Sequence, residues 1–161
     1  TPRRDFEIGL FALKLLCEKM PEVEVVFAGW DISTFEIPFK YRDMGIMSVD
    51  KLSKVYSQCD LCLIISNTNL SLLPLEVMAS NSVAVCSKGS NSTWLVNEEN
   101  AVLVEYEPRN IADTMEYYLT HPDELAEIRS KGLAFAQSTS WEKEAEKVRD
   151  ALLEGIKEDD K

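Results

Sequence analysis

The order of apolar and polar residues predicts helices and strands that alternate along most of the chain. Residues 5–20 repeat apolar side chains at helical spacing, and Val23–Gly29 then reads as a strand. The later elements expected are, in chain order, a short strand at Phe39–Arg42, a Ser48-capped helix through Tyr56, a strand at Leu61–Ile65, a helix at Pro74–Ser80, a strand at Val83–Cys86, a short helix near Trp94–Val96, a strand at Ala101–Tyr106 and helices over Asn110–Thr120, from Pro122 and from Ser140. This alternation predicts an α/β fold: a doubly wound, mainly parallel, Rossmann-like sheet with helices on both faces and a helical C-terminal third.

The segment Leu61–Glu76 is the most informative part of the pattern. It begins with the apolar run LCLII, which is typical of a buried parallel strand, and continues through a polar turn at Ser66–Asn69. Ligands of open parallel sheets bind beyond the carboxyl ends of the strands. The amides of Asn69 to Leu72, including those of Leu70 and Ser71, are therefore candidates for cradling a phosphate, although a simple capped turn explains Thr68 and its neighbours equally well.

Three other positions allow two interpretations each. Glu76, in the first turn of the expected helix, either compensates the helix dipole or accepts hydrogen bonds from sugar hydroxyls. Arg3 and Arg4 are either solvated surface residues or phosphate ligands in the loop after a preceding strand. The turn at 45–48, which contains Ile46 and Met47, either starts a helix or offers backbone groups and an apolar wall to a base.

Composition limits the possible partners. The chain has 161 residues, a net charge of −11 and 45% hydrophobic residues, and it contains no apolar run long enough to span a membrane. We expect one domain over residues 1–161, no nucleic acid partner and no transmembrane segment, because nucleic acids and anionic membranes require cationic surfaces. The chain opens on a helix without an initiator Met, so we expect a longer protein that supplies a central strand directly upstream of Thr1.

Cysteine and histidine patterns argue against several other chemistries. Cys59 and Cys62 form a C-x-x-C pair at the start of an expected buried strand, where buried, reduced thiols are a better interpretation than a redox or zinc site. His121 precedes Pro122 at a helix start, which favours a capping or exposed role. The chain has no metal-ligand cluster, G-x-G-x-x-G or P-loop pattern, so we expect no metal and no cofactor.

The segments GIMSVDKLSKVYSQCDLCLIIS, LSLLPLEVMASNSVAVCS and NSTWLVNEENAVLV resemble the C-terminal, donor-binding domain of retaining glycosyltransferases of family four, which have the GT-B fold. The Ser140-Trp141-Glu142 sequence after the Pro122 helix matches as well. Within this family, TNLSLLPLE, NSTWLVNEENAVLV and the opening TPRRDF look most like rhamnosyltransferases of bacterial cell-surface polysaccharide assembly.

The resemblance implies a role for each candidate residue. The family motif is Glu, seven residues, Glu, and its second Glu matches Glu76, which would bind the ribose of a nucleotide-sugar. The amides of Asn69 to Leu72 would face the diphosphate, together with Arg3 or Arg4, and the Ile46-Met47 backbone would contact the base. Thr68 stands where the family has its first Glu, near the donor sugar, and fits a deoxysugar donor. Leu70-Ser71-Leu72 replaces in part the usual Gly-Phe-Gly, and Asn81 replaces the Gly that usually follows the helix.

The resemblance implies a hexosyltransferase that moves a hexose or deoxyhexose, such as rhamnose, from a nucleoside-diphosphate sugar to a glycan acceptor. The acceptor would bind in an N-terminal domain outside this chain, so we expect the chain alone to be inactive, and no catalytic residue is assigned. The full enzyme would be cytoplasmic, or peripheral at the inner membrane face. The alternatives are a non-catalytic Rossmann-like interaction module and an unrelated flavodoxin-like domain, for which the expected acidic cluster or flavin loop is missing.

Overall fold

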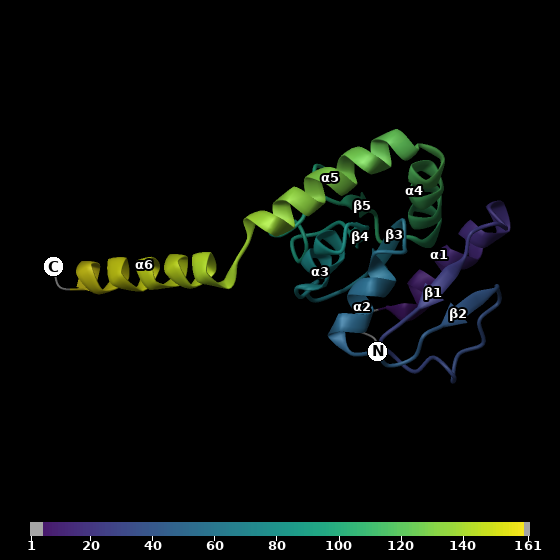
Figure 1. Cartoon of the computed structure of the whole chain (residues 1–161), viewed down its shortest axis with the longest axis horizontal. Coiled ribbons are helices and arrows are strands. Elements are labelled where there is room, and N and C mark those ends of the chain that lie inside the picture. The colour runs from purple at the N-terminus through teal and green to yellow at the C-terminus, as the bar shows by residue number, and fades with distance from the viewer. Residues whose placement is uncertain (1–4, 160–161) are drawn as a thin grey trace.

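The computed structural model describes residues 5–159 and contains six helices and five strands in this range (Figure 1). In chain order they are α1 (Phe6–Lys19), β1 (Val25–Phe27), β2 (Tyr41–Asp43), α2 (Val49–Tyr56), β3 (Leu61–Ile64), α3 (Leu73–Ala79), β4 (Val83–Ser87), β5 (Val102–Val104), α4 (Pro108–Thr120), α5 (Pro122–Ser138) and α6 (Trp141–Asp159). Every strand expected from the sequence is present, and each of its ends lies within two residues of the predicted position.

The prediction of a short helix near Trp94 is wrong. Residues 89–96 form consecutive hydrogen-bonded turns, in which the amides of Ser92 and Val96 donate to Gly89 O at 3.0 Å and Ser92 O at 3.1 Å. The Ser92 hydroxyl is also engaged locally, since it donates to Ser87 O at 2.6 Å. Such side-chain bonds to nearby carbonyls compete with helix formation, which explains why the apolar triplet at 94–96 does not extend into a helix.

The strands are all parallel, as predicted, but they form two sheets in the described part of the chain. One sheet pairs β1 with β2, with Val25 opposite Tyr41, and the other has the order β3-β4-β5. In the larger sheet, Leu61 lies opposite Val83 and Val85 opposite Val102. The expected single sheet is therefore divided between β1 and β3.

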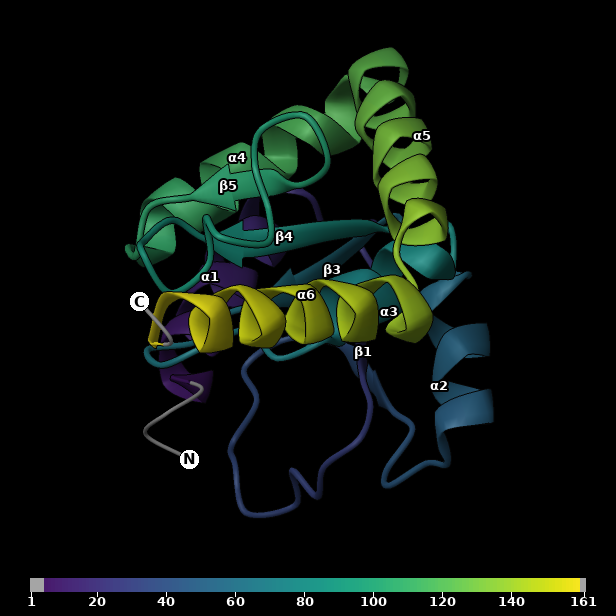
Figure 2. The same cartoon turned by 90° about the vertical axis from the view of Figure 1, so that its left-hand side faces the viewer.

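Strand β4 is the centre of the larger sheet, and all five of its residues are buried. Its side chains alternate between two hydrophobic cores. Val83 and Val85 face a core built with α1 and α4, whereas Ala84 and Cys86 face a core that includes α3 residues and Phe135 of α5. Figures 1 and 2 show this layering, with α1 and α4 on one side of the β3-β4-β5 sheet and α3 on the other. The predicted coverage of both faces is confirmed.

Helix α3 ends in a tight cap around Asn81, which has a φ of 59°. The Ser82 amide donates to Val77 O at 3.2 Å and the Asn81 amide donates to Met78 O at 3.0 Å. These two bonds form a Schellman motif, whose left-handed residue is usually glycine. The structure thus explains why the sequence pattern has Gly or Asn at this place, and the cap turns the chain directly into β4.

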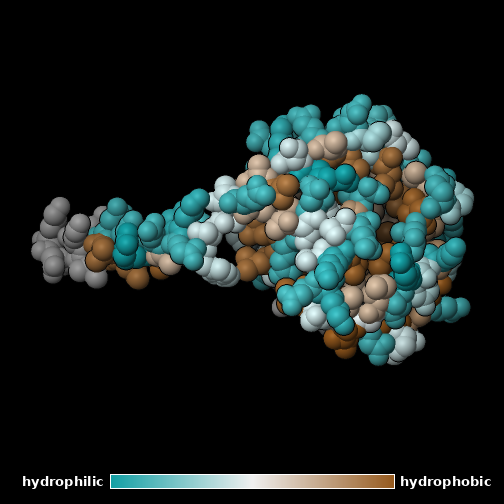
Figure 3. Space-filling view, in the orientation of Figure 1, coloured by the Kyte–Doolittle hydropathy of each residue, from teal (hydrophilic) through white to brown (hydrophobic). Residues whose placement is uncertain are grey.

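Helix α6 projects from the body of the molecule (Figure 1). Its first turn is capped by Ser140, whose hydroxyl accepts a hydrogen bond from the Lys143 amide at 3.2 Å, as the sequence predicts. Trp141, Val148 and Leu152 are all well exposed along it, and Figure 3 shows apolar residues on one side of the projecting helix. Among the helices of residues 5–159, none combines the length and hydrophobicity required to cross a membrane.

The cap of α3 yields a stability prediction. Replacing Asn81 with Ala should lower the free energy of unfolding by about 1 kcal/mol, because a left-handed backbone is unfavourable for a residue with a Cβ and no compensating short polar group. Asn81→Gly should match or exceed the parent stability, since glycine adopts this conformation freely. Urea unfolding of the three proteins tests this, and equal stability of the Ala and Gly variants would contradict the assigned cap.

Candidate functional site

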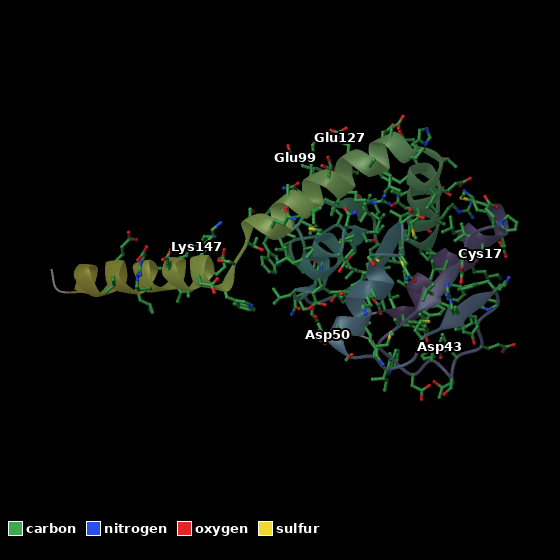
Figure 4. All side chains as sticks on the ribbon, in the orientation of Figure 1. Cys17, Asp43, Asp50, Glu99, Glu127 and Lys147 are labelled. Carbon is green, nitrogen blue, oxygen red and sulfur yellow. The ribbon has the colours of Figure 1, made fainter. Side chains whose placement is uncertain are left out.

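The loops after β1 and β2 are held together at the carboxyl ends of these strands. The Met44 amide donates to Phe27 O and the Gly29 amide donates to Gly45 O, both at 2.8 Å. Asp43, labelled in Figure 4, accepts a hydrogen bond from the Gly45 amide at 2.8 Å. Gly45 has a φ of 61°, a left-handed conformation that suits glycine. The turn expected to approach a base is therefore fixed by backbone geometry.

Ile46 and Met47 lie in this turn, directly before Ser48 and α2. The Ile46 side chain is 81% exposed, and Met47 is partly buried. Such exposure leaves an apolar surface open to a planar ligand next to the start of α2. Arg3 and Arg4, the expected phosphate ligands, lie outside the described residues.

The loop after β3 is tied to two neighbouring segments. Ser66 is buried, and its carbonyl accepts a hydrogen bond from the Asn91 side-chain amide at 2.7 Å, which joins the loops after β3 and β4. The side-chain amide of Asn67 donates to the carboxylate of Asp5, the residue that precedes α1. These bonds bring together three segments that are distant in sequence, at the rim where the sequence predicts a ligand.

The predicted diphosphate turn has a more defined conformation than the sequence suggests. Asn69 Oδ1 accepts a hydrogen bond from the Ser71 amide at 3.0 Å, and Ser71 has a φ of 54°. The Leu70 side chain is completely buried in the core beneath α3, so only its backbone remains available to a ligand. Thr68 and Leu72 are exposed. In this conformation the amide of Ser71 is directed to Asn69, and a phosphate would have to replace that contact.

Glu76 lies in the first turn of α3, as predicted, and its side chain is exposed at a cavity of about 440 Å³ between α2 and α3. The cavity is lined on the α2 side by Ser53, Lys54 and Tyr56, and on the α3 side by Glu76 and by Asn81 of the cap. Within residues 5–159 Glu76 forms no ion pair. Its carboxylate is therefore able to accept hydrogen bonds from a ligand.

Tyr56 and Lys54 were not identified as site residues from the sequence. Tyr56 lines the same cavity as Glu76, and partial burial, followed by the charge of Glu76, raises the pKa of the Tyr56 hydroxyl. Tyr56 and Lys54 line the cavity with Glu76 because α2 and α3 lie side by side. The available signal was indirect: α2 leads into β3 and α3 leaves it, and helices on the same side of one strand are close in space.

The four cysteines are all free thiols, but only Cys86 is completely buried. The expectation that the Cys59 and Cys62 thiols are buried is therefore only partly correct, since both are partly exposed. A hydrogen bond with Cys62 stabilises the Cys59 thiolate and lowers the pKa of Cys59 to about 7. The same contact, and burial, raise the pKa of Cys62. Burial alone raises the pKa of Cys86 to about 12.

Other candidate chemistries find no support in the described residues. His121 stacks on Tyr117 with ring centroids 4.0 Å apart, and its Nδ1 lies 2.7 Å from Tyr117 O, which makes it a structural residue at the α4–α5 junction. No group of three or more His, Cys, Asp or Glu side chains between residues 5 and 159 is placed to hold a metal ion.

Comparisons with known proteins identify relatives of this chain. The family described as "WsaF, C-terminal domain" matches residues 1–116. The O-antigen biosynthesis protein RfbC of Myxococcus xanthus is 29% identical over 157 residues, which are 94% of this chain and 12% of that protein. The chain thus spans only a small part of the length of this relative.

Solved structures establish the fold. Sucrose-phosphate synthase from Thermosynechococcus elongatus superimposes with a TM-score of 0.76 at 17% identity, over 96% of this chain and 44% of that one. HepE of Anabaena in complex with UDP gives a TM-score of 0.78 at 18% identity, over 96% and 46%. The C-terminal domain of the Francisella tularensis glycosyl transferase LpcC gives 0.72 at 18% identity, over 86% and 80%. These neighbours are GT-B glycosyltransferase domains, so the expected fold is confirmed.

The cysteine pair yields a chemical prediction. Alkylation of Cys59 by iodoacetamide should rise with a midpoint near pH 7, because the thiolate is the reactive form and its pKa is lowered. In Cys62→Ala the midpoint should move up towards the ordinary thiol value of about 8.5, since the stabilising donor is removed. Peptide-resolved mass spectrometry measures both, with Cys86 as an unreactive internal control. A midpoint that stays unchanged in Cys62→Ala would show that another group stabilises the thiolate.

Proposed function

The chain belongs to the family of WsaF C-terminal domains, and on this basis we propose that it is the donor-binding domain of a glycosyltransferase. The full enzyme would transfer a hexose or deoxyhexose from a nucleoside-diphosphate sugar to a glycan acceptor. Two findings support this proposal: the myxococcal relative is an O-antigen biosynthesis protein, and HepE of Anabaena, a neighbour in fold, has been solved with UDP-glucose and with UDP.

The observation that carries the proposal is the position of Glu76. Glu76 lies in the first turn of α3, directly after the turn at the carboxyl end of β3, where open parallel sheets bind their ligands, and it lines the cavity between α2 and α3. A carboxylate that accepts hydrogen bonds from two neighbouring hydroxyls is a common ribose contact. We assign the ribose of the donor to Glu76, with the base over the Ile46-Met47 turn at the start of α2.

The remaining donor contacts are assigned to the turn after β3. The backbone of Asn69 to Leu72 would face the diphosphate, and Arg3 or Arg4, which closely precede Asp5 in the sequence, would neutralise its charge. This assignment requires Ser71 to exchange its contact with Asn69 for a phosphate oxygen. Thr68, exposed in the same turn, would lie near the sugar and offers a hydroxyl where a carboxylate is usual, which suits a deoxyhexose such as rhamnose.

Catalysis would depend on positioning the donor and stabilising the diphosphate leaving group. The acceptor would be bound by another domain of the longer protein, so this chain alone would bind the donor without transferring it. No metal and no cofactor take part in the proposed reaction. The full enzyme would act in the cytoplasm, or at the inner face of the membrane.

Thr68 also supports a second candidate function. A domain that has lost the acidic residue near the sugar could persist as a non-catalytic interaction module with the same fold. The two candidates differ in one property, since only a donor-binding domain needs to recognise nucleoside diphosphates.

Titration calorimetry with UDP, GDP, dTDP and UDP-glucose tests the assignment of Glu76. We expect at least one ligand to bind, and Glu76→Gln to weaken it about tenfold to a hundredfold, since a hydrogen bond to a charged group contributes about 1.5–3 kcal/mol.

Glu146→Gln is the matched control, because Glu146 is an exposed carboxylate on the projecting helix α6, and it should bind as the parent does. Binding that is unchanged in Glu76→Gln would move the ribose site elsewhere. A folded protein that binds none of the four ligands would favour the interaction module.

A further inference from the structure

Exposed large apolar side chains follow every strand of the described chain, in the segments that leave the carboxyl ends. They include Trp30, Ile46, Leu72, Trp94 and Tyr106. Single exposed apolar residues are common on protein surfaces and need no ligand to explain them. Among the aromatic residues of this set, however, Trp94 is 63% exposed, against 43% for Trp30 and 36% for Tyr106.

The surroundings of Trp94 also differ from those of Trp30. Trp30 belongs to an aromatic cluster, in which its ring centroid lies 5.8 Å from that of Phe6 and 5.7 Å from that of Phe35. The indole N–H of Trp94 instead donates a hydrogen bond to Asn91 O at 3.0 Å. This bond satisfies the polar edge of the Trp94 side chain and fixes its orientation, so the exposed part is apolar ring surface.

The segment that carries Trp94 is anchored on both sides of the indole. Before it, the Ser92 hydroxyl donates to Ser87 O at 2.6 Å and lies 2.9 Å from Gly89 O. After it, Val96 is buried in the core on the α3 side of the sheet, and its amide donates to Ser92 O at 3.1 Å. The aromatic surface is therefore preorganised, and a ligand would bind it with little loss of conformational entropy.

Asn91 connects this aromatic residue to the turn after β3. Its side-chain amide donates to Ser66 O at 2.7 Å, two residues before Thr68. A Cβ at Gly89 would lie 2.7 Å from Asn91 Oδ1, so glycine at this position leaves the space that the Asn91 side chain needs. Trp94 thus lies in the loop that is bonded to the turn assigned to the donor sugar. Figure 2 shows β4 and β5 pointing to this edge of the sheet.

A pyranose ring has the chemistry that fits such a surface. Its hydroxyl groups lie mainly around the ring edge, whereas the C–H groups of a ring face form an apolar surface. Contact between this face and an indole removes apolar area from water on both sides. Tryptophan supplies this contact area with only two side-chain torsions to fix. The methyl group of a deoxyhexose would add to the apolar area that is buried.

We propose that Trp94 is a stacking platform for a pyranose ring next to the Thr68 turn, and that it helps to determine which sugar the site accepts. The inference rests on the proposed glycosyltransferase function, which supplies two sources of such a ring. One is the sugar of the nucleotide-sugar donor, and the other is the terminal sugar of the glycan acceptor. Both sources offer the same apolar face, and the ligands of the test distinguish them.

The direct test uses NMR of the indole N–H groups, because the chain contains three tryptophans and the signal of Trp94 is assigned by Trp94→Phe. The ligands are dTDP-rhamnose and UDP-glucose, the bare nucleotides dTDP and UDP, and methyl α-L-rhamnopyranoside. We expect a sugar-bearing ligand to shift the Trp94 signal and the bare nucleotides to leave it in place. A shift with nucleotide-sugars alone assigns the donor's sugar, and one with the methyl glycoside alone assigns the acceptor.

Titration calorimetry measures the contribution of the ring to affinity. Trp94→Ala should weaken binding of the sugar-bearing ligand about tenfold, and Trp94→Phe less, since phenylalanine retains a smaller aromatic face. Binding of the bare nucleotide should not change. Trp141→Ala is the matched control, because Trp141 is an exposed tryptophan on the projecting helix α6, and it should bind as the parent does. Equal urea midpoints would show that all variants remain folded.

Three results would overturn the inference. In the first, no sugar-bearing ligand shifts the Trp94 signal, which would leave this surface to a protein partner. In the second, the bare nucleotide shifts it as strongly as the nucleotide-sugar does. In the third, Trp94→Ala retains the parent affinity for the ligand that causes the shift. Failure of the proposed function is recognised separately, since it requires that calorimetry detect no binding of any nucleotide or nucleotide-sugar to the folded parent.

Discussion

The burial of β4 on both faces is the constraint on which the rest of the structure depends. The first four residues of β4, Val83 to Cys86, are apolar on both faces and require a hydrophobic layer on each side, and their alternating side chains belong to one core in each layer. The α1–α4 layer covers one face of β4, and the α3 layer covers the other. Helix α3 is held by this packing, and its first turn, with Glu76, is consequently fixed at the carboxyl edge of the sheet.

The loops at the rim of the sheet are held by contacts of different range. The Asn91 side chain donates a hydrogen bond to Ser66 O, and the Ser92 hydroxyl donates one to Ser87 O. These bonds leave the loops after β3 and β4 little freedom. By contrast, Thr68 and Ser71 lie in an exposed turn stabilised by a local side-chain contact from Asn69. The exposed turn proposed for the diphosphate is thus carried on a scaffold held by longer-range hydrogen bonds.

Local patterns predicted most of the fold, because each element depends mainly on its own residues. The run VAVC at 83–86, the Ser140 cap and the left-handed position at Asn81 all behave as their residue types indicate. The failures concern long-range contacts. The turns at 89–96 depend on a bond from Ser92 to the end of β4, and the partial exposure of Leu63 depends on the division into two sheets, which local periodicity does not specify. For the same reason the place of Glu76 in the first turn of a helix was predicted, whereas its position beside Tyr56 at one cavity required the three-dimensional arrangement.

Helix α6 has a consequence for the cooperativity of the molecule. Its 19 residues extend about 28 Å at the helical rise, and a local pair such as Glu144–Lys147, of which Lys147 is labelled in Figure 4, supports it along its own length. Helices in proteins gain most of their stability from packing of an apolar face, which is exposed on α6, whereas the body around β4 is stabilised by two cores. The helix and the body are therefore separate cooperative units with different opening free energies, so that a single two-state transition describes the body but not the whole chain.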